Sequence, residues 1–144
     1  MWINKPKIVI RTIQDSCELF DPHDLMVFVQ ARRFSERWDE LGLTDTELQE
    51  LERLLMLDPR RGSVVRSTGG LRKLRFSAAP LKKGKRGGLR ICYVFFSEFS
   101  LIHLLLVYPK NEQDDLTYVA RKQISSLIKE IHRQLASRPR IADS

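Results

Sequence analysis

The sequence predicts a small α+β domain built from a twisted, mainly antiparallel sheet, two N-terminal helices and one C-terminal helix. Two apolar runs of strand length, 89–96 and 101–108, follow each other across a short turn, as neighbouring central strands would. Two segments with helical apolar spacing precede these runs, and a third, 117–135, follows them. With 144 residues, 42% of them hydrophobic, the chain is long enough for one core and is most simply a single domain.

The N-terminal part carries the weakest pattern. Residues 1–25 contain no core stripe, and we expect them to be an extension that is dispensable for activity. The alternative is that 7–13 adds an edge strand, in which case removing the segment would destabilise the protein. Residues 26–32 predict a strand by their β-branched and aromatic content. The predicted domain covers 26–136, and residues 137–144 form a polar, flexible tail.

Helix signals are clearest in the first half of the chain. A short amphipathic helix is predicted by apolar residues spaced four and three apart before a glycine: Phe34, Trp38, Leu41 and Gly42. Thr44 and Glu47 then form a capping box, whose side chains satisfy the first free amides of a second helix. Asp58 ends that helix, since the residue before Pro59 is pushed out of helical geometry.

The second half of the chain predicts the sheet. Residues 63–76 suit a strand interrupted at 68–70, where two glycines indicate a bulge or a tight bend. Residues 89–96 and 101–108 are apolar on both faces, which places them at the centre of the sheet. The four residues 97–100 between them are enough for a hairpin turn.

Positive charge is concentrated in one stretch. Residues 59–97 contain no Asp or Glu and hold 11 of the chain's 25 basic residues: Arg60, Arg61, Arg66, Arg72, Lys73, Arg75, Lys82, Lys83, Lys85, Arg86 and Arg90. The other 14 basic side chains are outnumbered by 18 acidic ones. A local basic field on a mildly acidic body indicates a surface for a polyanion, most commonly a nucleic acid.

Strand alternation predicts how these charges are arranged. Lys73 and Arg75 are two residues apart and share one face of a strand, while Leu74 and Phe76 share the other. Arg90 opens the next strand. If the two strands pair as a hairpin, Lys73, Arg75 and Arg90 lie close together on an exposed face of the sheet. A solvated basic hairpin without any chemistry would show the same pattern.

Composition also limits the class of protein. No apolar run approaches the roughly 20 residues that a membrane-spanning helix needs, and the N-terminus lacks the apolar region of a secretory signal. The only cysteines, Cys17 and Cys92, give neither a disulfide framework nor the spacing of a metal site. We therefore expect a cytoplasmic protein that contacts no membrane and requires no metal or cofactor.

Four short motifs follow one another along the second half of the chain: GGLRKLR (69–75), GKRGGLRICY (84–93), YPKNE (108–112) and DLT (115–117). Together they resemble the RelE/HigB toxins of bacterial toxin–antitoxin systems, most closely the HigB-like branch. The resemblance covers about residues 26–135. It implies a RelE-like fold of the kind predicted above, with the active face on the concave side of the sheet. It also implies a ribosome-dependent endoribonuclease that cuts mRNA in the ribosomal A site and so inhibits translation.

The resemblance further assigns roles to individual residues. It implies catalytic functions for Lys73, Arg75 and Arg90 on the two strands, and for Lys110 and Asn111 after the last strand. RNA and ribosome contacts are expected from the neighbouring basic residues: Arg72, Lys82, Lys83, Lys85 and Arg86. The implied partners are the ribosome, mRNA and a cognate HigA-like antitoxin with a helix-turn-helix domain. DNA would be contacted only through the antitoxin.

One position departs from the family pattern. Some relatives place a functional tyrosine where this chain has Thr117 followed by Tyr118, so Tyr118 is a minor candidate. The histidines His23, His103 and His132 are expected to be structural or surface residues.

These side chains suit cleavage without a metal, in which the RNA 2′-hydroxyl is the internal nucleophile. Arg75 and Arg90 cannot deprotonate and fit phosphate binding and charge stabilisation. Like charge from the neighbouring arginines, Arg72 among them, favours a neutral Lys73 that can accept a proton.

Two other function classes share this charge pattern. A pure RNA- or ribosome-binding module would ideally place aromatic side chains among the charges for base stacking, whereas the aromatic residues here are expected to be mostly buried: Phe76, Tyr93, Phe95 and Phe96. A structural or regulatory protein that binds an acidic partner is the other class. It would need no cleavage chemistry at all.

Overall fold

The computed structural model describes residues 7–12, 25–77, 88–112 and 116–137. Its elements, in chain order, are β1 (Lys7–Thr12), β2 (Leu25–Gln30), α1 (Arg32–Glu40), α2 (Asp45–Leu57), β3 (Ser63–Val64), β4 (Arg72–Phe76), β5 (Leu89–Phe96), the 3₁₀ turn η2 (Ser97–Phe99), β6 (Leu101–Pro109) and α4 (Tyr118–Ser137). The α+β class, the two N-terminal helices and the C-terminal helix are confirmed. Among the described helices, none combines the length and the apolar character needed to cross a bilayer.

The described strands form one six-stranded sheet in the order β1-β2-β6-β5-β4-β3. Only β2 and β6 pair in parallel; every other neighbouring pair is antiparallel. The prediction of a mainly antiparallel sheet is therefore confirmed. The two doubly apolar strands, β5 and β6, occupy its centre, because strands covered on both faces need apolar side chains on both. They are joined by η2 and by Ser100, whose φ of 47° lies in the left-handed region.

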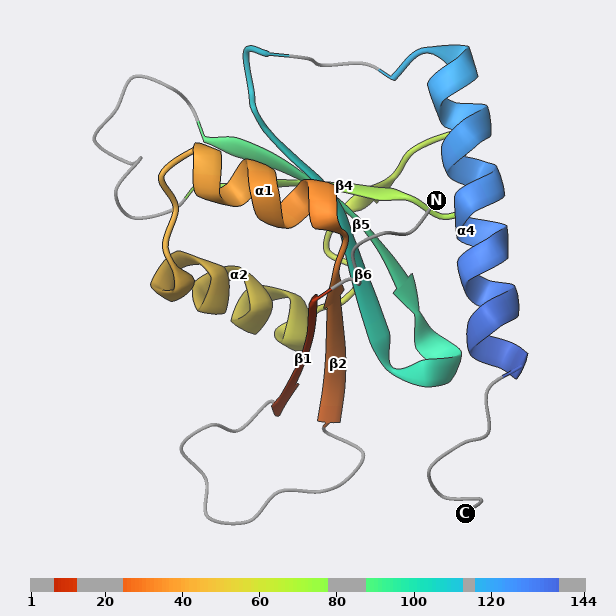
Figure 1. The fold of residues 1–144 in the computed structure, drawn as a ribbon, viewed down its shortest axis with the longest axis horizontal. Helices are drawn as coiled ribbons and strands as arrows, with labels where there is room; N and C mark the ends of the chain where they lie inside the picture. The colour runs from red at the N-terminus through yellow and green to blue at the C-terminus, as the bar shows by residue number, and fades with distance from the viewer. Residues whose placement is uncertain (1–6, 13–24, 78–87, 113–115, 138–144) are drawn as a thin grey trace.

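Helices cover both faces of the sheet. Figure 1 shows α1 and α2 on one side of β4, β5 and β6, and α4 on the other. The core under α1 and α2 contains Phe28, Phe34, Trp38, Leu51, Leu55, Phe76, Ile91, Tyr93, Ile102 and Leu104, among others. The core under α4 contains Val29, Leu71, Cys92, Val94, Phe96, Leu101, Leu105, Tyr108 and Ile128. Alternation along β4, β5 and β6 thus assigns each side chain to one of two cores.

Aromatic packing and a helix cap hold α1 and α2 in place. The rings of Phe34 and Trp38 stack with centroids 5.5 Å apart, and Trp38 also stacks on Phe76 at 6.4 Å. The Trp38 indole nitrogen donates to the Thr44 carbonyl at 3.1 Å, which ties α1 to the start of α2. The Glu47 carboxylate accepts from the Thr44 amide and hydroxyl, both at 2.6 Å, so the predicted capping box is confirmed. These bonds lower the pKa of Glu47.

A tight turn separates β3 from β4, as the two glycines predict. Gly69 and Gly70 adopt φ values of 80° and 126°, which residues with a side chain rarely adopt. The buried Thr68 hydroxyl donates to the Val65 carbonyl at 2.6 Å and accepts from the Leu71 amide at 3.1 Å. This turn shortens β3 to two residues and leaves it at the edge of the sheet.

The N-terminal segment contributes the opposite edge. Residues Lys7–Thr12 form β1, which pairs antiparallel with β2 from Lys7↔Gln30 to Thr12↔Leu25. The alternative stated for 7–13, an edge strand, is therefore the one that the structure has. Of the predicted tail, 137–144, Ser137 is the last residue of α4, and residues 138–144 lie outside the described residues.

Candidate functional site

The β4–β5 pairing gathers the predicted cations. Arg75 lies directly opposite Arg90, and Lys73 lies opposite Cys92, so all three cations project from the same face of the sheet. That face is the α4 side, because Cys92 belongs to the core under α4. The prediction that Lys73, Arg75 and Arg90 come together through a hairpin is confirmed.

These cations line a pocket of about 590 Å³ at the β3 end of the sheet, which we call the basic pocket. Its lining consists of Arg61, Ser63, Val64, Val65, Lys73, Leu74, Arg75 and Arg90. Four of these side chains are cationic, and among the described residues that line the pocket none is acidic. The volume falls within the range of small-ligand sites. Both its size and its charge suit an anionic group larger than a single ion.

Arg90 is the buried member of this set. The sequence predicts an exposed side chain, but only 6% of Arg90 is exposed, because it lies on a central strand between Arg75 and Tyr108. Its Nη1 atom is buried and has no hydrogen-bond partner among the described residues. A buried guanidinium nitrogen without an acceptor is costly. A bound anion would supply that acceptor.

Lys73 is the cross-strand neighbour of Cys92, whose thiol is buried. Burial raises the pKa of Cys92 to about 11, and a hydrogen bond with Tyr108 and the positive charge of Lys73 counteract part of that rise. Cys92 therefore stays a neutral thiol near neutral pH, and it is not among the residues that line the basic pocket. The register Lys73↔Cys92 places this amine on the α4 side of the sheet.

Arg72 lies apart from the other three cations. It pairs with Tyr93, which belongs to the core under α1 and α2, so strand alternation directs Arg72 to the opposite face. Its Nη1 atom donates to the Gly62 carbonyl at 2.7 Å and to the Arg60 carbonyl at 3.2 Å. The expectation that Arg72 crowds Lys73 is therefore wrong, because odd and even positions of one strand face opposite ways.

Three of the remaining predicted residues, Lys110, Asn111 and Tyr118, are described and do not line the basic pocket. Lys110 and Asn111 are exposed in the turn after β6, where the Lys110 amide donates to the Gly88 carbonyl at 3.2 Å. Tyr118 is 67% exposed at the start of α4, with the Lys122 amine 5.4 Å from its ring centroid. The predicted loop contacts fall outside the described residues: Lys82, Lys83, Lys85 and Arg86.

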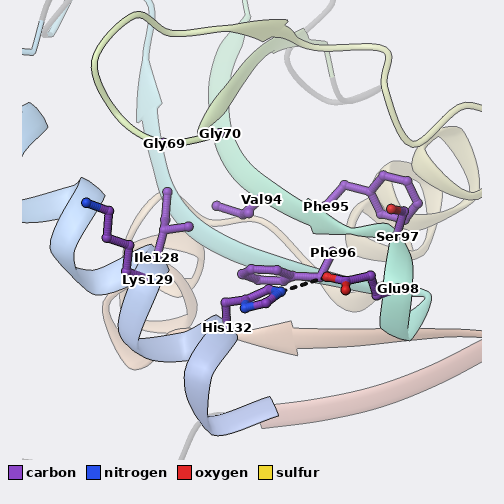
Figure 2. Close-up of a pocket in the computed structure, with 10 residues that line it drawn as sticks. All are labelled: Gly69, Gly70, Val94, Phe95, Phe96, Ser97, Glu98, Ile128, Lys129 and His132. Carbon is purple, nitrogen blue, oxygen red and sulfur yellow. Dashed lines mark hydrogen bonds and ion pairs between the residues drawn. The ribbon is translucent and has the colours of Figure 1, made fainter. Parts of the chain in front are cut away.

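A second pocket, of about 400 Å³, lies between the end of β5, the Gly69–Gly70 turn and α4. Figure 2 shows His132 of α4 reaching across it to Glu98, with 2.7 Å between Nε2 and Oε1. The Phe96 and Phe99 rings lie 6.0 and 5.8 Å from the His132 ring. These contacts dock the helix on the β5–β6 turn. None of the candidate site residues that the structure describes lines this second pocket.

Sequence reasoning missed Arg61, which lines the basic pocket from the segment between α2 and β3. The sequence offered one indication of Arg61, its position directly before a glycine in the stretch that contains no Asp or Glu. Because eleven basic residues share that stretch, this position did not single it out. Among the described residues no group of three or more His, Cys, Asp or Glu side chains gathers as a metal site. No protein-family model matches the chain.

Proposed function

We propose that the protein is a ribosome-dependent, metal-independent mRNA endoribonuclease, a toxin of the RelE/HigB type that inhibits translation by cutting mRNA in the ribosomal A site. The observation that carries this proposal is the basic pocket. Lys73, Arg75 and Arg90 line it together with Arg61, and the buried Nη1 atom of Arg90 has no acceptor among the described residues. A phosphodiester would bring negative charge and acceptor oxygens to these cations.

The chemistry follows from which side chains can change protonation. In the proposed reaction the RNA 2′-oxygen attacks the adjacent phosphorus, its proton passes to Lys73, and the bond to the 5′-oxygen breaks. The products are a 2′,3′-cyclic phosphate and a 5′-hydroxyl, whose oxygen takes up a proton from water as it leaves. Arg75 and Arg90 bind the non-bridging oxygens and stabilise the charge that develops there. In this proposal Lys110 and Asn111, which follow β6, contact the bound RNA.

Dependence on the ribosome follows from what the pocket offers. The described residues that line it include neither a histidine nor a carboxylate, so it provides charge stabilisation without a tuned acid–base pair. Effective cleavage then requires the RNA to be held in the reactive geometry. We assign that positioning to the ribosome, and part of the docking to the basic residues of the loop after β4.

The proposal includes a cognate antitoxin with a helix-turn-helix domain, and DNA contact only through it. An acidic antitoxin segment would complement the positively charged basic pocket. Expression of the chain alone in bacteria should stop growth, and co-expression with the neighbouring small gene should restore it. Normal growth in the presence of the intact, folded protein would count against a toxin.

A cleavage assay on purified translating ribosomes tests the proposal and separates it from the other function classes. The wild-type protein should cut mRNA in the A site, and Lys73→Ala should bind the ribosome without cutting. If wild type binds but never cuts, the protein is an RNA- or ribosome-binding module. If it does neither, a regulatory role toward an acidic protein partner is the better account.

A further inference from the structure

Two side chains hold the segment between α2 and β3 against the sheet. The hydroxyl of Tyr93, which is fully buried, donates to the Pro59 carbonyl at 2.8 Å and accepts from the Gly62 amide at 2.9 Å. Arg72 adds hydrogen bonds to the carbonyls of Gly62 and Arg60. We call this arrangement the Tyr93–Arg72 clamp. It fixes both ends of residues 59–62.

The fit of this segment leaves little room for a side chain at Gly62. A Cβ atom there would lie 3.0 Å from Cε1 of Tyr93 and 3.1 Å from the Lys73 carbonyl oxygen, closer than ordinary van der Waals contact. Glycine therefore lets the segment approach the strand that carries Lys73. The position of residues 59–62 is tied directly to the position of the candidate catalytic strand.

Two consecutive arginines of this segment, Arg60 and Arg61, contact different parts of the protein. The Arg60 guanidinium carbon lies 5.1 Å from the ring centroid of Phe95, a residue that packs against the core under α1 and α2. Arg61 lines the basic pocket instead, where its side chain is exposed. Two adjacent arginines of the same segment therefore end in different places: Arg60 lies over the Phe95 ring, and Arg61 lines the basic pocket.

We propose that Arg61 binds a second phosphate of the RNA, next to the scissile one, and that the Tyr93–Arg72 clamp positions it for this contact. This inference rests on the proposed function. The pocket has a buried cation, Arg90, and an exposed one, Arg61, and its volume of about 590 Å³ exceeds what one phosphate fills. An arginine whose backbone is already fixed loses less conformational entropy on binding than one on a free loop.

The inference can be tested on the free full-length protein. The probes are the uncleavable 2′-O-methyl dinucleotide UpU and the same dinucleotide with a terminal phosphate at its 5′ or its 3′ end. NMR or calorimetric titration at low salt measures their affinities. One of the two terminal phosphates should tighten binding to wild type by about fivefold or more, as expected for one charge-assisted hydrogen bond.

Three variants show which residue is responsible for the tighter binding of the dinucleotide with a terminal phosphate. Arg61→Ala should reduce it to less than about twofold, whereas the matched control Arg60→Ala should keep it, although both remove one positive charge from the same segment. Tyr93→Phe keeps the buried ring and removes the two hydrogen bonds of the Tyr93 hydroxyl, while the two Arg72 bonds remain, so it should lose part of the gain while still binding UpU. Melting curves confirm that each variant is folded.

The outcomes separate this inference from the proposed function. If the terminal phosphates add nothing for wild type, or if Arg60→Ala loses as much as Arg61→Ala, Arg61 has no specific phosphate and the inference is wrong. The ribosome cleavage assay is independent of that result and continues to decide the proposed function. If no dinucleotide binds at all, the basic pocket is not a phosphate site, and the inference is again overturned.

Discussion

Arg75 and Arg90 lie directly opposite each other on the antiparallel strands β4 and β5, and among the described residues neither forms an ion pair. Directly opposed like charges destabilise a strand pair. The cost is greater here because the Arg90 side chain is buried, with only 6% of it exposed. A sequence selected for stability alone would not keep this pair. The pair is better explained by a ligand that carries the opposite charge.

The first prediction is that Arg90→Met stabilises the free protein. Methionine fills a similar volume without a buried, unpaired nitrogen, so the free energy of unfolding should rise by about 1–2 kcal/mol. Urea unfolding at low salt measures this change. Arg75→Met is the matched control and should change stability less, because Arg75 is exposed to solvent. A loss of stability in Arg90→Met would show that its guanidinium already has a compensating partner.

The second prediction concerns anions. Millimolar phosphate should raise the melting temperature of wild type above its value in chloride at the same ionic strength, because a ligand that binds only the folded state stabilises it. Arg90→Met should lose most of this difference. An equal response of both proteins to phosphate would mean that the anion acts elsewhere or only through general screening.

The folded core was largely predictable because local signals agreed with each other. The Thr44–Glu47 capping box begins α2, and the doubly apolar runs marked the strands that became the central β5 and β6. Alternation along β4 was enough to put Lys73 and Arg75 on one face. What failed depended on contacts between distant residues: the burial of Arg90 comes from its neighbours on β4 and β6.

Two details around the basic pocket were also beyond sequence reasoning. The segment that carries Arg61 is held by the hydroxyl of Tyr93, which bonds Gly62 across 31 positions of sequence. The charge of Arg72 suggested an RNA contact, which stays a prediction, but gave no sign that its guanidinium bonds the backbone of the preceding segment. These hydrogen bonds leave no periodic pattern in the sequence.

The third prediction concerns His103. Burial lowers the pKa of His103 to about 4, from 6.5, and its buried Nδ1 atom has no hydrogen-bond partner within the described part of the chain. The unfolded chain therefore binds a proton more readily, so the stability contributed by neutral His103 is complete above about pH 6.5 and is lost as pH falls toward 4. Between about pH 7.5 and pH 5 the free energy of unfolding should fall by about 2 kcal/mol.

Denaturant unfolding at the two pH values measures this loss. His103→Leu should remove most of it, because leucine suits the apolar register partners Val29 and Val94 and does not titrate. The control His132→Gln changes a histidine that is more exposed and paired with Glu98, and it should retain the loss. An unchanged pH dependence in His103→Leu would assign the effect to other groups.

The fourth prediction concerns the edge strand β1. A chain that begins at Met26 leaves the outer edge of β2 without its antiparallel partner, so its melting temperature should fall by about 5 °C or more and it should aggregate more readily. Cleavage per folded molecule should be unchanged, because β1 and β4 lie near opposite edges of the sheet. Equal melting temperatures would show that residues 1–25 are dispensable for stability as well.

The fifth prediction separates docking from chemistry. Four basic residues stand in the sequence between β4 and β5: Lys82, Lys83, Lys85 and Arg86. Replacing several of them should weaken ribosome binding in a salt-dependent way and leave the cleavage rate at saturation unchanged. Such residues contact phosphates without being fixed at the scissile bond. Ribosome affinity measured over a range of salt concentrations should show a smaller salt dependence for the replaced loop. A saturated rate that falls with the loop charges would place them in the reaction itself.

The central claim is tested most directly by single-turnover cleavage with the ribosome saturated by the protein, so that binding no longer limits the rate. Lys73→Ala and Arg90→Ala should each cut mRNA at least about 100-fold more slowly than wild type, the usual cost of a lost transition-state charge, while they still bind the ribosome. If Lys73→Ala cuts as fast as wild type under these conditions, Lys73 is a binding residue and the proposed mechanism is wrong.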